Sequence, residues 1–202
     1  MKKFLLSIHI IIALVLAGCG LFLSPLPKDE ELIAYFYAHR SDLEELVKRD
    51  RQYVPEQRGM HHLWMKQGDT PQLLQRAGVE RLSETVYIWI PDSYAPDFLS
   101  RRNALRDERW DLFYSRYSAL EIHLNDVRYF SSPFFKTLLH FPEVPRVKEN
   151  LLITPGEDEK KQLEKRYPDH VVYPSLNNHL PQKGYCALRQ IEPQWFINVC
   201  HF

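Results

Sequence analysis

Residues 184–202, GYCALRQIEPQWFINVCHF, give the clearest β-strand signal in the chain. Two runs rich in aliphatic and aromatic residues flank Glu192-Pro193-Gln194, which is the pattern of a hairpin with a three-residue loop. Side chains of a strand alternate between its two faces, so one set of residues across the hairpin shares a face. We expect this set to face the core: Tyr185, Ala187, Ile191, Trp195, Ile197 and Val199.

The register of this hairpin predicts a disulfide bond. A loop centred on Pro193 places Cys186 opposite Cys200, and opposed residues of antiparallel strands have Cα atoms about 4.5 to 5.5 Å apart, within disulfide range. The sulfur atoms then lie on the more polar face of the hairpin, where we expect the bond to be partly accessible; this face carries Leu188, Gln190, Phe196 and Asn198. The alternative is a catalytic thiol paired with a histidine, but no cysteine-hydrolase motif is present.

An amphipathic helix is predicted near the start of the chain, within residues 27–54. Acidic residues 29–31 in its first turn and basic residues near its end match the helix macrodipole. Apolar residues recur at helical spacing and predict the side that packs on the core: Leu32, Phe36, Leu43, Leu46 and Val47.

Strands and shorter helices are predicted along the rest of the chain. Strands are predicted at residues 84–90, 118–124 and 134–141, which are rich in β-branched and aromatic residues. Helices are predicted at 70–77, with Thr70 as N-cap, Pro71 following it and Gly78 ending it, within 96–117, and at 158–167. Together these elements predict a single α+β domain: an N-terminal amphipathic helix packed on a mostly antiparallel sheet that ends in the C-terminal hairpin.

The first residues have the features of an export signal. Lys2 and Lys3 precede an apolar stretch at 4–16, and the small residues Ala17 and Gly18 follow it. An uncleaved membrane anchor is the alternative, but about 13 apolar residues are short for a spanning helix, which needs about 20. We therefore expect a signal peptide at residues 1–18.

The end of this segment, LAGC at residues 16–19, resembles the lipobox of bacterial lipoproteins. The resemblance implies that Cys19 becomes the first mature residue and carries a diacylglycerol, usually with an acylated amino group. Residues 19–27 would then be a lipidated tether and residues 28–202 the globular domain. Gly20 stands where an Asp commonly signals inner-membrane retention, so the resemblance favours the outer membrane, facing the periplasm.

Three further segments resemble parts of small uncharacterised lipoproteins of enteric and related bacteria. They are residues 27–47 (PKDEELIAYFYAHRSDLEELV), 124–147 (LNDVRYFSSPFFKTLLHFPEVPRV) and 188–202 (LRQIEPQWFINVCHF). In those relatives the ending more often resembles a strand pair without the two cysteines. The resemblance implies a place in the cell envelope, but it supplies no catalytic residue.

The charge of the chain argues against nucleic acid as a partner. Removal of residues 1–18 takes away two of the 26 basic residues and none of the 26 acidic ones, which leaves a net charge of −2. Binding of nucleic acid or of anionic lipid headgroups usually needs a basic field. We expect the membrane contact to be made through the acyl chains on Cys19.

No catalytic, metal or cofactor motif emerges from the sequence. The patterns GxSxG, HExxH and CxxC, the P-loop and the Gly-rich dinucleotide turn are all missing. His61 and His62 are adjacent and so point in different directions, and the pair of His39 and Asp42 also suits a solvated helix face. We therefore predict no catalytic residue, no metal site and no cofactor.

Aromatic residues beside prolines and charges suggest a protein contact surface. Most aromatics so placed pack on a core, but a minority mark interfaces; the candidates are Tyr94, Phe98, Tyr129, Phe130 and Phe134. The first hypothesis is a non-enzymatic envelope protein that binds another protein, of which an inhibitor or immunity protein is one case. The alternatives are an envelope hydrolase of an unrecognised type and a structural envelope accessory.

Replacement of Cys19 tests the predicted lipidation and membrane anchoring. We expect Cys19→Ser to abolish metabolic lipid labelling and to release the chain from the membrane fraction, because the thioether to the diacylglycerol cannot form. Labelling with a radioactive fatty acid and fractionation of the envelope measure both. Membrane-bound mature protein without an acyl label would contradict the lipoprotein hypothesis.

Overall fold

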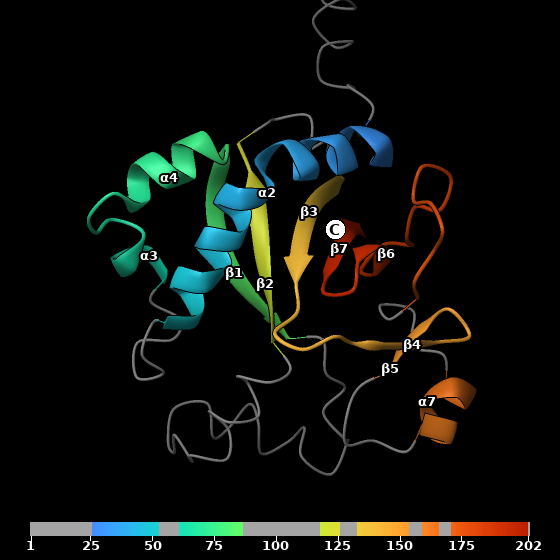
Figure 1. Ribbon diagram of the computed structural model, residues 1–202. Helices are drawn as coiled ribbons and strands as arrows, with labels where there is room; N and C mark the ends of the chain where they lie inside the picture. The colour runs from blue at the N-terminus through green and yellow to red at the C-terminus, as the bar shows by residue number, and fades with distance from the viewer. Residues whose placement is uncertain are drawn as a thin grey trace, which may run out of the picture.

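A five-stranded sheet lies at the centre of the molecule (Figure 1). The computed structural model describes residues 26–52, 61–86, 118–125, 133–153, 159–165 and 171–201. The helices in these residues are α2 (Asp29–Gln52), α3 (His61–Trp64), α4 (Thr70–Arg76) and α7 (Glu159–Lys165). The strands are β1 (Val79–Val86), β2 (Ser118–Leu124), β3 (Phe134–His140), β4 (Arg146–Lys148), β5 (Leu151–Ile153), β6 (Cys186–Glu192) and β7 (Trp195–His201).

The strands of the central sheet follow the order β1-β2-β3-β7-β6. Every neighbouring pair is antiparallel, and β4 and β5 form a separate two-stranded sheet. The C-terminal hairpin thus contributes both an inner strand, β7, and an edge strand, β6. This confirms the predicted α+β class, with an N-terminal helix and a mostly antiparallel sheet that ends in the hairpin.

Helices α2 and α4 lie on one face of this sheet and share a hydrophobic core with it (Figure 1). All five residues predicted for the apolar side of α2 are buried. The ring of Phe36 lies 5.0 Å from the ring of Trp195, and full burial of a side chain of this size contributes about 1.5 to 3 kcal/mol. Of the predicted hairpin face, Ala187, Trp195, Ile197 and Val199 belong to this core, Ile191 packs against it and Tyr185 is exposed.

The opposite face of the hairpin is buried over most of its length, which corrects in part the expectation of a polar, accessible face. Leu188 and Phe196 are fully buried and Asn198 is 1% exposed, whereas Gln190 is exposed and Cys186 is half-buried. The two apolar residues pack in a second core cluster with Leu152 of β5 and with Val172. Residues 171–173 follow the edge of β6, where the Tyr173 N–H donates to the Leu188 carbonyl at 2.7 Å. The sheet is therefore covered on both faces at this end.

The hairpin register is confirmed, although its turn is shorter than expected. Cys186 pairs with Cys200 and Gln190 with Phe196, as the three-residue loop required. The register then shifts between Gln190 and Glu192, so that Glu192 pairs with Trp195. A two-residue turn plus one extra residue in β6 has the same effect on the remaining pairs as a three-residue loop. The disulfide forms between Cys186 and Cys200, whose Cα atoms lie 4.0 Å apart.

Two element boundaries differ from the sequence prediction. Asp69 is the N-cap of α4 in place of Thr70, which is the first helical residue. Strand β1 begins at Val79 rather than at Glu84, because pairing with β2 extends it through a polar stretch that carries little strand signal of its own. Residues 87–117, which include the rest of the predicted strand and one predicted helix, lie outside the described residues.

Gly78 ends the connection between α4 and β1 at a point where the backbone and its surroundings favour glycine. Its φ of +56° lies in the left-handed region, and an added Cβ would stand 2.5 Å from the hydroxyl oxygen of Tyr35. That hydroxyl donates a hydrogen bond to the Ala77 carbonyl. Helix α2 therefore approaches the backbone of this turn closely, and the prediction that Gly78 stops the helix is correct.

Loss of the disulfide should lower stability modestly. The bond closes a loop across a separation of 14 residues, for which chain entropy gives about 3 kcal/mol. We expect the double variant Cys186→Ser/Cys200→Ser to stay folded, because the core on the helix side of the sheet is untouched. Urea unfolding of both proteins measures the difference. Complete unfolding of the variant, or two free thiols at these positions in exported protein, would contradict it.

Candidate functional site

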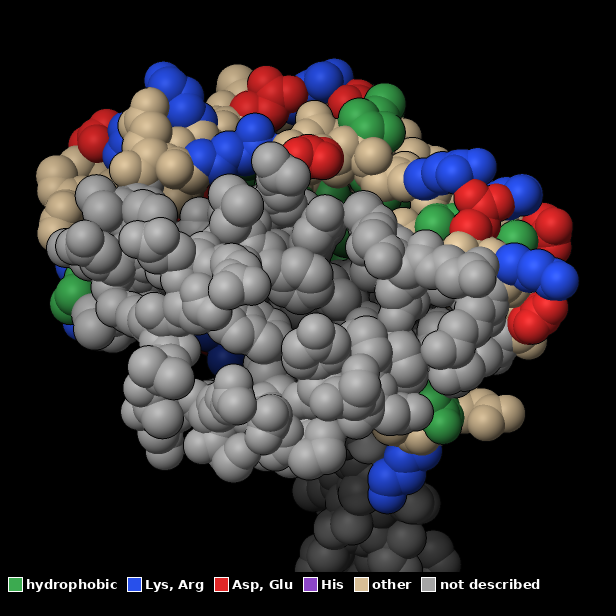
Figure 2. All heavy atoms as spheres, turned by 90° about the horizontal axis from the view of Figure 1, so that it is seen from below, with side chains coloured by type: hydrophobic (Ala, Val, Ile, Leu, Met, Phe, Trp, Pro, Cys, Tyr) green, Lys and Arg blue, Asp and Glu red, His purple; other side chains and the backbone are tan. Residues whose placement is uncertain are grey.

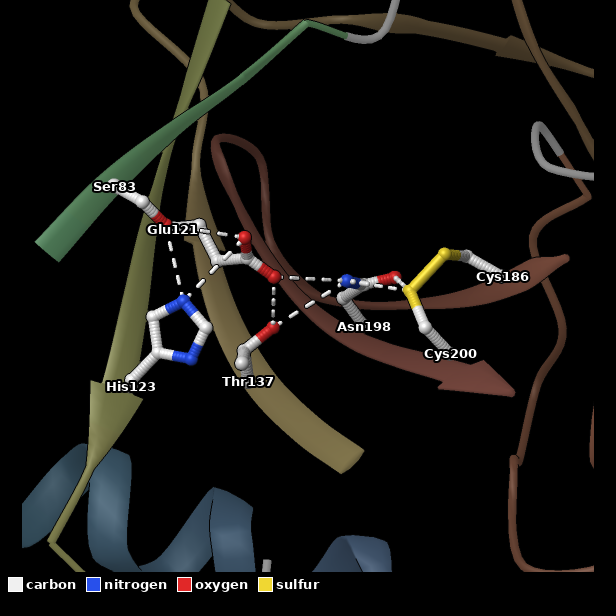
Figure 3. Close-up of a disulfide and its surroundings, with 7 residues drawn as sticks. All are labelled: Ser83, Glu121, His123, Thr137, Cys186, Asn198 and Cys200. Carbon is white, nitrogen blue, oxygen red and sulfur yellow. Dashed lines mark hydrogen bonds and ion pairs between the residues drawn. A yellow bond between two sulfur atoms is a disulfide. The ribbon is translucent and has the colours of Figure 1, made fainter. Parts of the chain in front are cut away.

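A row of polar side chains crosses the sheet behind the disulfide (Figure 3). The carboxylate of Glu121, a residue 7% exposed, accepts hydrogen bonds from Thr137 Oγ1 at 2.9 Å and from Ser83 Oγ at 3.2 Å. Asn198 Nδ2 donates to the same carboxylate at 3.3 Å and also lies 3.3 Å from Cys200 Sγ. A buried carboxylate is tolerated only with such donors. The row therefore joins β1, β2, β3 and β7 through one acidic group.

Ser83, His123 and Glu121 resemble a hydrolase triad in composition but not in geometry. In a triad, the hydroxyl and the acid contact opposite nitrogens of the imidazole, so that a proton can be relayed. Here Ser83 Oγ lies 3.0 Å from His123 Nε2, and Glu121 Oε2 lies 3.5 Å from the same nitrogen. Because both groups meet one nitrogen, these three residues do not form the acid-to-hydroxyl relay that such a hydrolase uses.

The sequence did not lead us to predict the polar row, although the spacing of two ionisable residues indicated it. Glu121 and His123 are two residues apart in the strand SALEIHL and so share a face of it. Two ionisable residues on one face of an otherwise apolar strand indicate a polar partner across the sheet. The partners Thr137 and Asn198 are opposite each other in the β3–β7 pairing, which the sequence does not supply.

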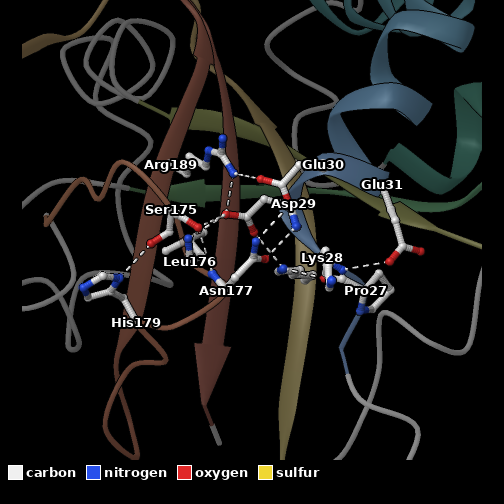
Figure 4. A network of polar contacts seen from close by, with 11 residues as sticks. Pro27, Lys28, Asp29, Glu30, Glu31, Ser175, Leu176, Asn177, His179 and Arg189 are labelled. Atoms are coloured by element: carbon white, nitrogen blue, oxygen red, sulfur yellow. Dashed lines mark hydrogen bonds and ion pairs between the residues drawn. The ribbon is translucent and has the colours of Figure 1, made fainter.

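A second polar network holds the start of α2 (Figure 4). Asp29 is fully buried, and its carboxylate contacts Lys136 Nζ at 2.8 Å and Arg189 Nη1 at 2.7 Å. The Leu176 N–H donates to it at 2.6 Å, and Lys136 Nζ also donates to the Pro27 carbonyl at 2.6 Å. The network joins the chain before α2, strands β3 and β6, and the loop at residues 175–177.

The charge state of Asp29 follows from these contacts. Burial alone would raise the pKa of its carboxyl, but the hydrogen bonds from Lys136, Leu176 and Arg189 outweigh burial and hold the pKa below its ordinary value. Asp29 is therefore ionised at neutral pH, next to an ammonium group that is 2% exposed. The sequence indicated an acidic partner for Lys136, because this lysine lies within the apolar strand FFKTLLH and a lysine is almost never fully buried unless it is paired.

A groove of about 470 Å³ lies between the C-terminal half of α2 and the turn of the β6–β7 hairpin. Successive turns of α2 supply one wall, the end of β3 contributes His140, and the hairpin turn forms the other wall. The side chains that line it are Arg40, Glu44, Val47, Lys48, Arg51, Gln52, His140, Glu192, Pro193, Gln194 and Trp195. Its volume falls in the range of about 300 to 1,000 Å³ that is typical of ligand sites.

Hydrogen bonds fix both walls of this groove. At one end Arg40 contacts Glu44 at 2.7 Å and Glu192 at 2.8 Å, which connects α2 to the hairpin. At the turn, Gln194 Nε2 donates to the carbonyl oxygens of Phe141 at 3.0 Å and Pro142 at 2.8 Å. The walls thus keep their spacing through side chains from three separate segments of the chain.

His140 lines the groove beside Arg51, and its imidazole is uncharged. Its ring is 4.6 Å from the ring of Trp195, in an edge-to-face arrangement. Burial, assisted by the positive charge of Arg51, lowers the pKa of His140 to about 4. The imidazole is therefore uncharged at neutral pH, and Nδ1 accepts a hydrogen bond from Arg51 Nη2 at 3.3 Å.

Most residues predicted for a site fall outside the described residues. This holds for the lipidation residue Cys19 and for the aromatics Tyr94, Phe98, Tyr129 and Phe130. Phe134 is described: it is half-buried at the start of β3, packs against the helix-side core and lies 4.3 Å from the ring of His201. The structure therefore brings only the disulfide pair together, and the aromatic contact surface stays a prediction.

The described residues offer neither a metal site nor a helix that could span a membrane. No group of three or more His, Cys, Asp or Glu side chains among them could hold a metal ion. Among the helices that the structure describes, none has the length and apolar character needed to cross a membrane.

In comparison with known proteins, the chain matches no protein-family model, no curated protein and no solved structure. Its function must therefore be inferred from its own residues.

Removal of the Asp29 charge should destabilise the fold strongly. We expect Asp29→Asn to lower the free energy of unfolding by about 3 to 5 kcal/mol, because Lys136 would remain buried as an unpaired cation. The double variant Asp29→Asn/Lys136→Met should recover much of this loss. Glu30→Gln is the matched control, since Glu30 is exposed and its loss should change stability little.

Urea unfolding of the four proteins measures these differences. Because the pKa of Asp29 is held below its ordinary value, its contribution is present above about pH 4 and is lost as the pH falls further. Equal losses for Asp29→Asn and Glu30→Gln would mean that the buried pair does not hold α2 to the sheet.

Proposed function

We propose that this chain is a lipid-anchored protein of the bacterial cell envelope that binds another protein non-enzymatically, through the groove between α2 and the β6–β7 turn. The groove is the observation that carries the proposal, because its walls are fixed by hydrogen bonds before any partner arrives. Pre-organised walls lower the entropy that binding costs. An inhibitor or immunity protein would use a surface of this kind.

The anchored end and the groove lie at different ends of α2. The lipobox-like segment places the acyl chains on Cys19, and nine tether residues reach at most about 30 Å. The chain is fixed at Pro27 and Asp29 by Lys136, and the groove begins at Arg40 and continues to Gln52. At a rise of about 1.5 Å per residue, the groove lies roughly 17 to 35 Å along the helix from Asp29.

This arrangement supports a partner in the periplasm. With the tether beside the membrane, the far half of α2 and the hairpin turn would be directed away from the lipid surface. Along the margins of the face seen in Figure 2, described Lys and Arg side chains lie among described Asp and Glu side chains. Mixed charge of this kind, with a net charge of −2 after signal removal, suits a protein partner better than a polyanion.

Site-specific photocrosslinking in the full-length, membrane-anchored protein tests the proposal. A photoreactive amino acid at Gln52 or Lys48, which line the groove, should give a discrete adduct with one envelope protein. The same amino acid at Lys160, whose side chain is 85% exposed on α7, is the control and should not. Mass spectrometry of the adduct then identifies the partner.

Two outcomes of this experiment would contradict the proposal. The first is the same set of adducts from Gln52, Lys48 and Lys160, which would indicate random collision. The second is no adduct from either groove position in cells that produce the protein at its native level, which would favour a structural accessory.

A further inference from the structure

The groove is electrically asymmetric. At one end, the single guanidinium of Arg40 is shared by two carboxylates, Glu44 and Glu192, so this end has a net negative charge. At the other end lie Lys48 and Arg51, two cations that also line the groove. A ligand that fits both ends would need a positive group near Glu44 and Glu192 and a negative group near Arg51.

Arg51 is held in place by neutral acceptors. Its Nη2 donates to the carbonyl oxygens of Phe141 at 3.4 Å and Pro142 at 3.3 Å, and to His140 Nδ1 at 3.3 Å. Within the residues that the structure describes, no carboxylate pairs with Arg51. A guanidinium carries five N–H donors, and these contacts use only one of its three nitrogens. The group is therefore positioned but keeps donors for an acidic ligand.

Lys48 adds a second cation on the same face of α2. Its side chain is 63% exposed, and it contacts Glu45 at 3.2 Å. An exposed pair of this kind is weak, so Lys48 can readily exchange Glu45 for another carboxylate. Lys48 can thus turn to a ligand without a large loss of stability.

We propose that this groove receives a short segment of the partner protein that carries an acidic residue for Arg51 and Lys48 and a basic residue for Glu44 and Glu192. The inference rests on the proposed function and adds the chemistry of the partner. A polyanion such as nucleic acid would be repelled at the Glu44 and Glu192 end. A zwitterionic segment satisfies both ends at once.

Helix geometry sets the spacing of the two charges. Glu44 and Arg51 are seven residues apart on α2, which corresponds to about 10 Å along the axis. An extended peptide covers this distance in about three residues. The segment should therefore carry its basic and acidic residues about three positions apart.

A peptide titration tests this chemistry on the mature, lipidated chain in detergent micelles. The probe is the peptide Ser-Lys-Ser-Ser-Glu-Ser with blocked ends, and the matched probe has Gln in place of its Glu. Nuclear magnetic resonance shifts of the Gln194 side-chain amide, which lies in the groove wall, give the dissociation constants. We expect the Gln peptide to bind about tenfold or more weakly than the Glu peptide, through loss of the charge-assisted contact to Arg51.

Protein variants identify the groups that bind. We expect Arg51→Gln to weaken binding of the Glu peptide about tenfold and Lys48→Gln about threefold. Arg51 is already held in place by three acceptors, whereas Lys48 must leave Glu45 to reach the peptide. Lys160→Gln on α7 removes the same charge away from the groove and should leave binding unchanged. If Arg51→Gln fails to fold, the Lys48→Gln variant tests the inference instead. Lys48 makes one described ion pair, which is exposed, so its replacement should not affect folding.

Several results would overturn the inference. They are no binding of the Glu peptide, equal binding of the Glu and Gln peptides, or no greater effect of Lys48→Gln than of Lys160→Gln. Displacement of the peptide by an equal concentration of inorganic phosphate would show a site for a free anion instead. Adducts at Gln52 in the crosslinking experiment would persist in all these cases if the proposed function holds, so the two failures are distinguishable.

Discussion

Lys136 and Asp29 meet in the interior between β3 and the first turn of α2, and neither side chain could be buried there alone. The contacts of Asp29 with Arg189 and the Leu176 N–H bring β6 and the loop at residues 175–177, which precedes it in the chain, to the same point. The start of helix α2 is therefore held in one orientation on the sheet. Such a pair adds little net stability compared with apolar residues, so its structural effect is to select this placement.

The position of the groove depends on that placement. Residues 29 and 51 are at opposite ends of one helix, and each is bound to the sheet or to the chain that leaves it. Between them, Phe36 and the other apolar residues of α2 pack on the sheet. A helix fixed at both ends keeps its outer residues at a constant distance from the β6–β7 turn. The groove is thus a consequence of how α2 is held.

The two faces of the sheet are buried in different ways. On the helix side, a large apolar cluster fills the space beside the buried pair of Asp29 and Lys136. On the other side, a polar row around Glu121 lies beside an apolar cluster that includes Phe196. Because each member of the row contacts a donor or acceptor on a neighbouring strand, the row favours one strand register over its alternatives. The disulfide adds a covalent bond to the same register, at the edge of the sheet.

By itself the sequence determined the elements with strong local periodicity. The apolar side of α2, the strands at 118–124 and 134–140, and the pairing of Cys186 with Cys200 all follow from spacing along the chain. The burial of the second hairpin face, the partner of Asp29 and the groove were decided only by the tertiary structure. Each joins residues more than 50 positions apart along the chain. Arg51 and His140 meet in the groove, Asp29 and Lys136 form the buried pair, and Phe141 packs on Phe196 on the second face. Local periodicity carries no information on which distant segment covers a face or neutralises a charge.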